Sequence, residues 1–340
     1  MAGNRGVAYI KPGVVEIQSI DYPKLVLEDQ NRKCEHGVIL KIVSTNICGS
    51  DQHMVRGRTT AAEGLILGHE ISGINQKDNS PVVINPLITC MKCQDCHDGR
   101  EHICSNRSLL GMTKPVARAG GFAEFVTAPS QNIFSVPLSV NLQNLSLTEP
   151  TAVAFHAVKI AEQVSFKKID EANILIIGGG AIGLLLALVL KAKNAEEVII
   201  IDTNSKRLDV CKKASSYAVA HPDDVSIKHN NYDIVFDAVG FEATRKKSIQ
   251  CVRQGGAILH IGLSQPSGAF DFRKATLQEI TFIGTYCYTN EDFKRSLDML
   301  IAEELGDLTW LDYRPLKDGA KAFREIHDGI TSSPKIILLP

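Results

Sequence analysis

The sequence predicts an α/β protein with a β-rich first domain and a second domain built on a doubly wound parallel sheet. Three observations carry this prediction. The chain has 340 residues, which is more than one hydrophobic core usually serves. Short strand-like runs such as 38–43 and 122–126, separated by Gly, Pro, Asn and Asp, dominate residues 1–150. From residue 151 apolar runs alternate with helical stretches, which is typical of βαβ units.

The second domain is predicted to span residues 151–285 and to open with a helix at 151–163. Its buried parallel strands are expected in five apolar runs: 174–177, 198–201, 233–237, 257–261 and 280–283. Residues 286–340 are expected to form a C-terminal segment with a helix at 292–304. A final strand at 335–339 is predicted to return to the first domain.

The charge balance argues against large charged partners. With 37 basic and 38 acidic side chains the net charge is −1, so no field attracts nucleic acid or an anionic membrane. The longest apolar stretch, 181–190, is too short to span a bilayer, and the first residues lack the apolar core of a secretion signal. We therefore expect a cytoplasmic protein that acts on a small molecule and binds neither nucleic acid nor membrane.

Gly178, Gly180 and Gly183 form a G-x-G-x-x-G pattern between a predicted strand and a predicted helix. In this context the first glycine permits a tight turn, the second lets the backbone approach a pyrophosphate, and the third lets the helix lie close to the strand. Ala181 and Ile182 begin the helix, whose N-terminus faces the phosphate charge. We predict that these five residues bind a dinucleotide.

Asp202 lies nineteen residues after Gly183, at the end of the next predicted strand. A carboxylate at this place accepts hydrogen bonds from the ribose hydroxyls and repels a 2′-phosphate, which favours NAD over NADP. Lys206 and Arg207 follow closely and could flank the adenine. Solvated surface charge is the alternative role for both.

Four of the nine cysteines fall within residues 90–104. Their C-x2-C-x2-C-x7-C spacing lets four thiolates converge on one tetrahedral ion: Cys90, Cys93, Cys96 and Cys104. A zinc ion held this way is closed to substrate and stabilises a polar surface lobe, and an iron–sulfur cluster is the competing interpretation. The isolated cysteines are predicted as small buried apolar residues: Cys34, Cys211, Cys251 and Cys287.

Cys48 and the adjacent pair His69 and Glu70 offer one sulfur, one imidazole and one carboxylate. This is the mixed ligand set of an open, catalytic zinc. Taken singly, each residue has an ordinary alternative: a buried thiol, a hydrogen-bonded histidine and a surface acid. Only the combination indicates a metal site.

The motifs together resemble the zinc-containing medium-chain dehydrogenase/reductase superfamily, in the order of that family and over nearly the whole chain. They are C-G-S-D at 48–51, G-H-E at 68–70, the four-cysteine lobe, G-G-F-A-E-F at 120–125, G-x-G-x-x-G and D-A-V-G at 237–240. The resemblance implies a GroES-like β-barrel catalytic domain over 1–150, a Rossmann nucleotide domain, and an active site in the cleft between them. It also implies one catalytic and one structural zinc ion, NAD, and assembly as a homodimer or homotetramer.

By this resemblance Cys48 and His69 bind the catalytic zinc, with Glu70 as a ligand or exchangeable near-ligand. Glu149 stands at the start of the helix that leads into the nucleotide domain. The sorbitol and polyol dehydrogenase branch also has a glutamate there, whereas simple alcohol dehydrogenases have cysteine. An acid favoured by the helix dipole is the alternative for Glu149, and it is compatible with a ligand role. The resemblance therefore favours a secondary alcohol or sugar alcohol as substrate.

The expected chemistry is hydride transfer. Zinc as a Lewis acid lowers the pKa of a bound alcohol and makes its carbon a hydride donor to the nicotinamide. The resemblance implies that Ser50 hydrogen-bonds the alcohol and that His53 passes the proton outward, a task suited to the pKa of histidine. A surface histidine is the alternative for His53. Substrate specificity is expected in pocket-lining residues, for which the sequence suggests three candidates: Arg56, Phe122 and Tyr286.

Two features depart from the polyol pattern. Residues 46–61 look very like glutathione-independent formaldehyde dehydrogenase, so oxidation of formaldehyde or a primary alcohol is the second hypothesis. Between Gly73 and Val82 most relatives carry a longer turn, so a shortened barrel edge is expected at 74–81. The alternative of another class is a non-catalytic or zinc-independent NAD-binding protein, which would have no need for the open zinc site.

Overall fold

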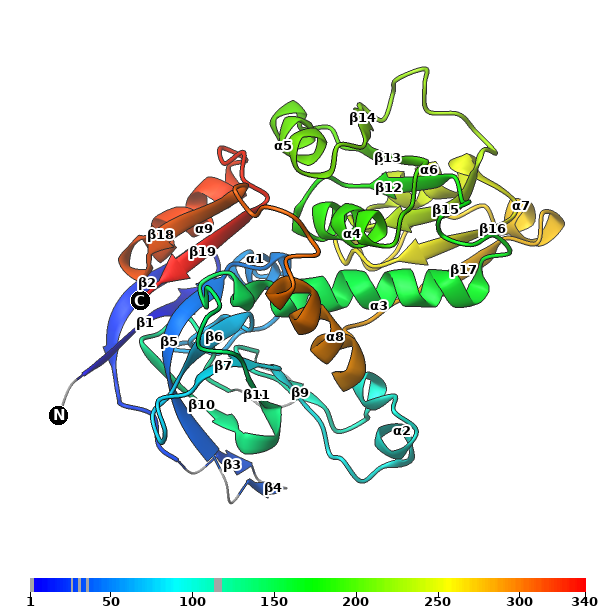
Figure 1. Cartoon of the computed structure of the whole chain (residues 1–340). Helices are drawn as coiled ribbons and strands as arrows, with labels where there is room; N and C mark the ends of the chain where they lie inside the picture. The colour runs from blue at the N-terminus through cyan, green and yellow to red at the C-terminus, as the bar shows by residue number, and fades with distance from the viewer. Residues whose placement is uncertain (1–2, 26, 30–31, 35–36, 113–117) are drawn as a thin grey trace.

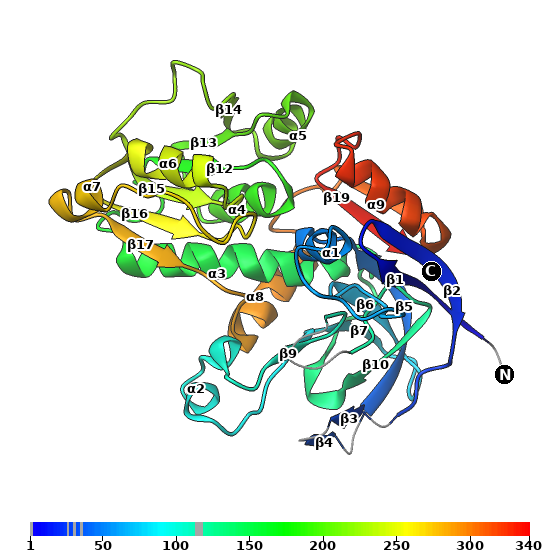
Figure 2. The same cartoon turned by 180° about the vertical axis from the view of Figure 1, so that it is seen from behind.

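The computed structural model describes residues 3–25, 27–29, 32–34, 37–112 and 118–340. A β-rich domain and a nucleotide-type α/β domain lie side by side, joined by the long helix α3 (Thr148–Val164) (Figure 1). In the view from behind, α3 runs beneath the sheet of the α/β domain and the four-cysteine loop lies at the end of the β-rich domain (Figure 2). Among the described residues no helix is long and apolar enough to cross a membrane.

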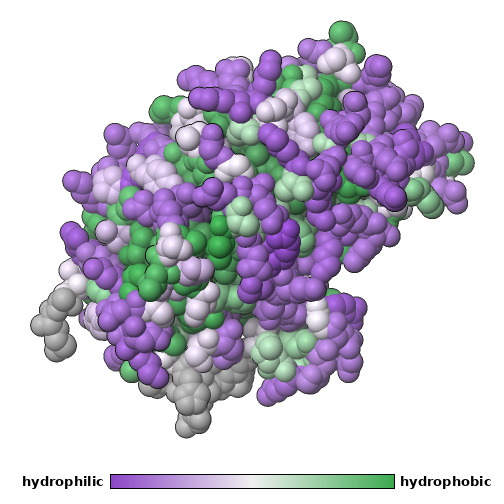
Figure 3. All heavy atoms as spheres, viewed as in Figure 1, coloured by the Kyte–Doolittle hydropathy of each residue, from purple (hydrophilic) through white to green (hydrophobic). Residues whose placement is uncertain are grey.

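The β-rich domain contains most of its elements before α3. They are β1 (Asn4–Lys11), β2 (Val14–Ile20), β3 (Leu27–Asp29), β4 (Arg32–Cys34), β5 (Gly37–Asn46), α1 (Gly49–Val55), β6 (Ile71–Asn75), β7 (Pro81–Ile84), β8 (Leu87–Ile88), α2 (Gln94–His97), β9 (Ser108–Leu109), β10 (Phe125–Pro129) and β11 (Ile133–Ser135). Three more come from the C-terminus: β18 (Leu311–Pro315), α9 (Gly319–His327) and β19 (Lys335–Leu339). On the face shown in Figure 3, apolar side chains gather over this domain, and hydrophilic ones cover most of its neighbour.

The main sheet of this domain has the strand order β11-β7-β6-β5-β19-β18, with β10 also paired to β5. The last strand therefore lies inside the sheet of the first domain: β19 pairs antiparallel with β5, placing Ile337 opposite Asn46. The apolar residues on the inner faces of these strands, such as Leu40, Ile71 and Ile84, are fully buried. Because of this pairing, the start of β19 lies beside the end of β5.

The α/β domain contains β12 (Ile174–Ile177), α4 (Ala181–Ala192), β13 (Val198–Ile201), α5 (Ser205–Ser215), β14 (Ala218–Ala220), β15 (Tyr232–Asp237), α6 (Glu242–Cys251), β16 (Val252–His260), α7 (Phe272–Leu277), β17 (Thr281–Gly284) and α8 (Asn290–Ile301). Its strands are parallel, in the order β14-β13-β12-β15-β16-β17. Helices α3, α4 and α8 pack on one face, and α6 and α7 on the other. The strand order reverses between β12 and β15, where open sheets of this kind bind ligands outside the carboxyl ends of the strands.

The observed bounds differ from the predicted ones mainly at element ends. The runs at 174–177 and 198–201 coincide with β12 and β13. Helix α8 begins at Asn290 because the Thr289 side chain caps it by accepting a hydrogen bond from the Asp292 N–H. Where the sequence predicts a shortened edge, at 74–81, β6 and β7 pair directly, and Asn79 takes a positive φ in the turn between them.

Candidate zinc and dinucleotide sites

We call residues 90–104 the cysteine lobe. The sulfur atoms of its four cysteines converge on one point. Four sulfur pairs lie 3.5 to 3.9 Å apart, and a zinc ion about 2.3 Å from four tetrahedral sulfurs would set them about 3.8 Å apart. A backbone N–H bond from Lys92 is the main reason that the pKa of Cys90 is lowered to about 6, whereas burial raises the pKa of Cys96 to about 12. The donor set fits a closed tetrahedral ion.

The predicted ligands Cys48, His69 and Glu70 form a second cluster, the mixed-ligand cluster. Their ligand atoms all lie within 4.8 Å of one another. Cys48 is the N-cap residue of α1, and the other two immediately precede β6. Burial lowers the pKa of His69, but the Asp51 carboxylate and the Cys48 sulfur outweigh it, so that this pKa is raised well above its ordinary value. The imidazole Nε2 lies 3.2 Å from the Ser50 hydroxyl, which brings the predicted catalytic serine to the cluster.

Two buried glutamates adjoin this cluster but have different partners. Both oxygens of Glu70 are bonded: Lys335 Nζ lies 2.7 and 2.9 Å from them, and Asn46 donates its amide at 2.8 Å. Glu149 lies outside the close group of ligand atoms and accepts a hydrogen bond from the Tyr288 hydroxyl at 3.0 Å. Burial is the main reason that the pKa of Glu149 is raised to about 7. The charge of His69 lowers this pKa, whereas the charge of Glu70 raises it.

His53 lies at the opposite end of α1 from the Cys48 cap. Its Nδ1 is 3.5 Å from Arg58 Nη1, which is also 3.5 Å from the carbonyl oxygen of Ser264 in the α/β domain. Burial lowers the pKa of His53, and the positive charges of Arg58 and Arg56 lower it further. Arg58 therefore links the predicted proton-transfer histidine to the loop that follows β16.

The glycine turn after β12 has the geometry that its spacing predicts. Gly178 has a φ of +106°, which L side chains rarely adopt. A Cβ on Gly183 would lie 1.7 Å from the Gly178 carbonyl oxygen, whereas a Cβ on Gly180 would meet nothing within 4 Å. The backbone at Gly180 is thus open to a ligand. Asp202 accepts the Gly179 N–H at 2.7 Å, so its carboxylate reaches back to this turn.

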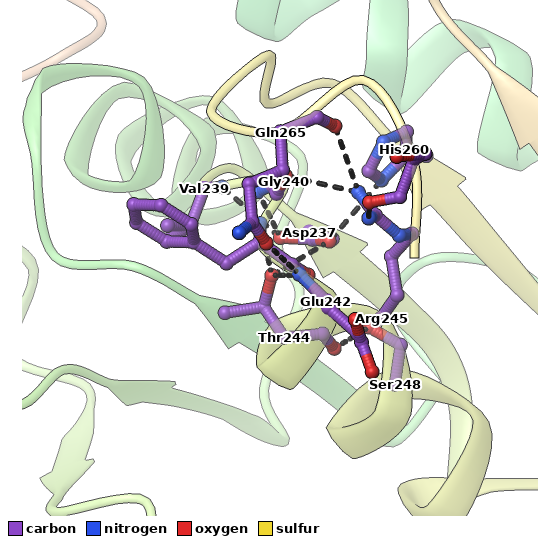
Figure 4. A network of polar contacts seen from close by, with 11 residues as sticks. Asp237, Val239, Gly240, Glu242, Thr244, Arg245, Ser248, His260 and Gln265 are labelled. Atoms are coloured by element: carbon purple, nitrogen blue, oxygen red, sulfur yellow. Dashed lines mark hydrogen bonds and ion pairs between the residues drawn. The ribbon is translucent and has the colours of Figure 1, made fainter. Parts of the chain in front are cut away.

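Asp237, at the end of β15, joins the loop after this strand to the end of β16 (Figure 4). The buried Asp237 carboxylate accepts the N–H groups of Val239 and Gly240 at 3.0 and 2.9 Å. Its other oxygen bonds the Thr244 hydroxyl and the His260 imidazole at 3.0 and 3.1 Å. The Val239 side chain packs against Gly178. This network, which the D-A-V-G motif alone did not predict, fixes the carboxyl edge of the sheet.

The three suggested pocket-lining residues lie in different parts of the structure, and the suggestion is wrong for Phe122. Phe122 is fully buried and packs edge-on against the Phe323 ring, so it belongs to the core of the β-rich domain. Arg56 lines a cavity of about 850 Å³ between the β1–β2 hairpin and α9. Tyr286 is 41% exposed, and the Arg107 guanidinium lies over its ring.

The other residues singled out in the sequence differ in how deeply they are buried. Lys206 is exposed, and Arg207 is partly buried on the first turn of α5. Cys211 and Cys251 are buried, as predicted, whereas Cys287 is only partly buried and has a φ of 48°. The side chain of Cys34 lies outside the described residues. Sequence reasoning missed Asn46, Arg58, Tyr288 and Lys335, because no local pattern links them to the ligands that they contact.

Comparisons with known proteins identify relatives of both domains. The model of the alcohol dehydrogenase GroES-like domain matches residues 35–138, and that of the zinc-binding dehydrogenase matches 181–302. The glutathione-independent formaldehyde dehydrogenase of Pseudomonas aeruginosa is 35% identical over 72% of the chain and 67% of its own length. D-xylulose reductase A of Aspergillus oryzae is 26% identical over 96% of the chain and 94% of its own length.

A solved structure shows the same fold over the whole chain. L-Idonate 5-dehydrogenase of Escherichia coli superposes with a TM-score of 0.85 at 22% identity, covering 100% of this chain and 99% of that one. The predicted fold class is therefore confirmed. Together with the identity to the formaldehyde dehydrogenase over more than two thirds of both chains, these matches also confirm the resemblance in the motifs: the protein belongs to the zinc-binding dehydrogenase family with a GroES-like domain.

Proposed function

We propose that the protein is a zinc-dependent oxidoreductase that transfers a hydride from a secondary alcohol or polyol to NAD. One observation carries the proposal: Cys48, His69 and Glu70 present three ligand atoms within 4.8 Å of one another, beside a second buried carboxylate, Glu149. A mixed set of this kind leaves a coordination position for substrate. The non-catalytic alternative offers no reason for such a cluster.

Zinc at this site would supply a Lewis acid that favours loss of the substrate hydroxyl proton. Cys48, His69 and one of the two glutamates would hold the ion. Ser50 would hydrogen-bond the reacting hydroxyl, a role supported by the 3.2 Å distance between its own hydroxyl and His69 Nε2. His53 then carries the proton outward: its pKa is lowered by burial and by Arg58, which keeps the imidazole neutral and able to accept a proton.

The dinucleotide is proposed to lie across the glycine turn, with its pyrophosphate at the N-terminus of α4. Gly178, Gly180, Ala181, Ile182 and Gly183 form that surface, and the open space at Gly180 supports it.

The charge on Asp202 favours NAD, because a 2′-phosphate would meet a like charge. The variant Asp202→Asn keeps one oxygen to accept the Gly179 N–H, and its kcat/KM with NADP should rise about tenfold, a change of about 1.4 kcal/mol. Asp209→Asn, which changes an exposed acid on α5, is the matched control and should leave the ratio of NAD to NADP unchanged. An unaltered ratio in Asp202→Asn would rule out this role.

The polyol class is supported by two relatives named for related chemistry, D-xylulose reductase and L-idonate 5-dehydrogenase. Oxidation of formaldehyde is the second candidate, because the formaldehyde dehydrogenase relative has the higher identity, 35%. We further propose that the protein is cytoplasmic. We also propose that it forms a homodimer or homotetramer, and light scattering of the purified protein would test this oligomeric state.

The deciding experiment measures NADH formation by its absorbance at a wavelength of about 340 nm. The substrates are sugar alcohols, secondary alcohols, primary alcohols and formaldehyde, each with and without a chelator. Chelator-sensitive turnover of a polyol is the expected result. Turnover of formaldehyde alone would favour the second candidate. No turnover, in a protein that binds zinc only in the cysteine lobe, would contradict the proposal.

A further inference from the structure

The segment 286–290, which joins β17 to α8, sends two neighbouring tyrosines in opposite directions. Cys287 between them has a φ of 48°, in the left-handed region that costs an L residue about 1 kcal/mol or more. Tyr286 is 41% exposed, whereas Tyr288 is fully buried against the Phe293 ring. A strained residue persists only where its surroundings determine the conformation, so this segment is held from outside.

The Tyr288 hydroxyl holds one of the two glutamates beside the mixed-ligand cluster. It donates to Glu149 Oε1 at 3.0 Å, and Glu149 Oε2 has no hydrogen-bond partner in the part of the chain that the structure describes. In contrast, Lys335 and Asn46 bond both oxygens of Glu70. Only Glu149 therefore combines an oriented carboxylate with a free oxygen.

The cysteine lobe clamps both ends of the segment that carries Tyr288. At one end the Arg107 guanidinium lies 4.7 Å from the centre of the Tyr286 ring and donates to the Cys104 carbonyl at 3.0 Å. At the other end the buried Glu101 carboxylate accepts the Asn290 N–H. Each contact joins the segment to a residue in or directly after the loop that the four cysteines fold.

A third contact ties the lobe to α3, the helix that carries Glu149. The His102 and His156 rings stack edge to face at 4.8 Å, and His156 Nδ1 pairs with Asp292 at 2.7 Å. Asp292 also accepts the Thr289 N–H in the cap of α8. The lobe, α3 and α8 thus form one packed unit around the contact between Tyr288 and Glu149.

We propose that Tyr288 is a positioning residue that aims Glu149 at the catalytic zinc as its third protein ligand, and that the cysteine lobe fixes Tyr288 through Arg107 and Glu101. This inference rests on the proposed zinc site. It assigns Glu70 to the surroundings of the ion, where Lys335 neutralises it.

The first test is Tyr288→Phe, which keeps the buried ring and removes the hydrogen bond. Partners of this kind cost about tenfold to a hundredfold in metal affinity or activity when lost. We expect zinc at the mixed-ligand cluster to be released to a chelator about tenfold faster than in the wild type. We also expect a changed visible spectrum of the cobalt-substituted protein and a lower kcat at unchanged KM for NAD. Wild-type zinc retention and an unchanged cobalt spectrum would overturn the role of Tyr288.

The second test separates the lobe from its clamps. Glu101→Ala and Arg107→Met should change the cobalt spectrum in the direction of Tyr288→Phe. The matched control is Arg100→Gln, which removes the exposed pair between Arg100 and Asp95 at 2.9 Å within the same lobe and should behave as the wild type. If all three variants behave alike, the lobe does not position Tyr288. The metal readouts need no substrate, so a failure of the proposed activity would be seen separately, as absence of wild-type turnover.

Discussion

The cysteine lobe and the mixed-ligand cluster differ in how the chain assembles them. The lobe takes four identical ligands from residues 90–104, and most of the side chains between them are exposed. The mixed-ligand cluster draws Cys48 from the start of α1 and His69 and Glu70 from the approach to β6. Glu149 and Lys335 join them from α3 and β19. A closed ion therefore stabilises one loop, whereas the open site depends on the whole fold.

This difference predicts that activity and stability respond to different substitutions. A closed tetrahedral ion contributes folding energy to the loop around it, whereas an open ion contributes chemistry. The open site also carries buried charges whose partners come from distant strands, so its electrostatics affect global stability even without metal.

The largest effect is expected from Cys48→Ser in the mixed-ligand cluster. Loss of a Lewis acid that contributes several kcal/mol to the transition state should lower kcat/KM about a thousandfold or more. Metal analysis should show loss of one zinc ion per chain while the lobe keeps its own. The control Cys251→Ser changes a buried cysteine in α6 and should retain both ions. Equal zinc content in Cys48→Ser and the control would contradict the ligand assignment.

The next effect concerns the buried pair of Glu70 and Lys335, which are 0% and 2% exposed. Lys335→Met leaves a buried carboxylate without its cation, which typically costs about 3 to 5 kcal/mol. Urea unfolding should show this loss, and the double variant with Glu70→Gln should regain most of it. A single variant as stable as the wild type would mean that Asn46 alone satisfies Glu70.

Much of the fold and of both ligand clusters could be predicted from the sequence, because their signals are local. The strand at 174–177 is a continuous apolar run, and the lobe ligands recur within a few residues. Lys335 and Tyr288 carry no such signal, since their partners lie 265 and 139 positions away. The suggestion that Phe122 lines the pocket is wrong, because its ring fills the space beside Gly68, where a Cβ would lie 2.7 Å from it.

A smaller effect should appear as a pH dependence in the metal-free protein. Burial raises the pKa of Glu149 from 4.5 to about 7, so the folded state keeps a proton that the unfolded chain has already released. The contribution of Glu149 to stability is therefore fully present below about pH 4.5 and is lost as the pH rises to about 7, by about 3 kcal/mol in total at 1.36 kcal/mol per unit.

The variant Glu149→Gln should remove this slope when metal-free unfolding is measured across the same range. Zinc affinity should show the opposite trend and rise with pH, because binding requires the carboxylate. A slope that persists in Glu149→Gln would assign the proton to another group.

The smallest effect is expected from Cys93→Ser, which removes one sulfur of the lobe. Because the lobe side chains are mostly exposed, its unfolding exposes little core, and the midpoint of thermal unfolding should fall by only a few degrees. Turnover should nevertheless fall about tenfold, since the clamp on the segment 286–290 loosens while zinc at the mixed-ligand cluster stays bound. Asp95→Asn, at the lobe surface, should change neither. If Cys93→Ser abolishes turnover as fully as Cys48→Ser, the two sites are not separable, and the lobe is part of the catalytic unit rather than its support.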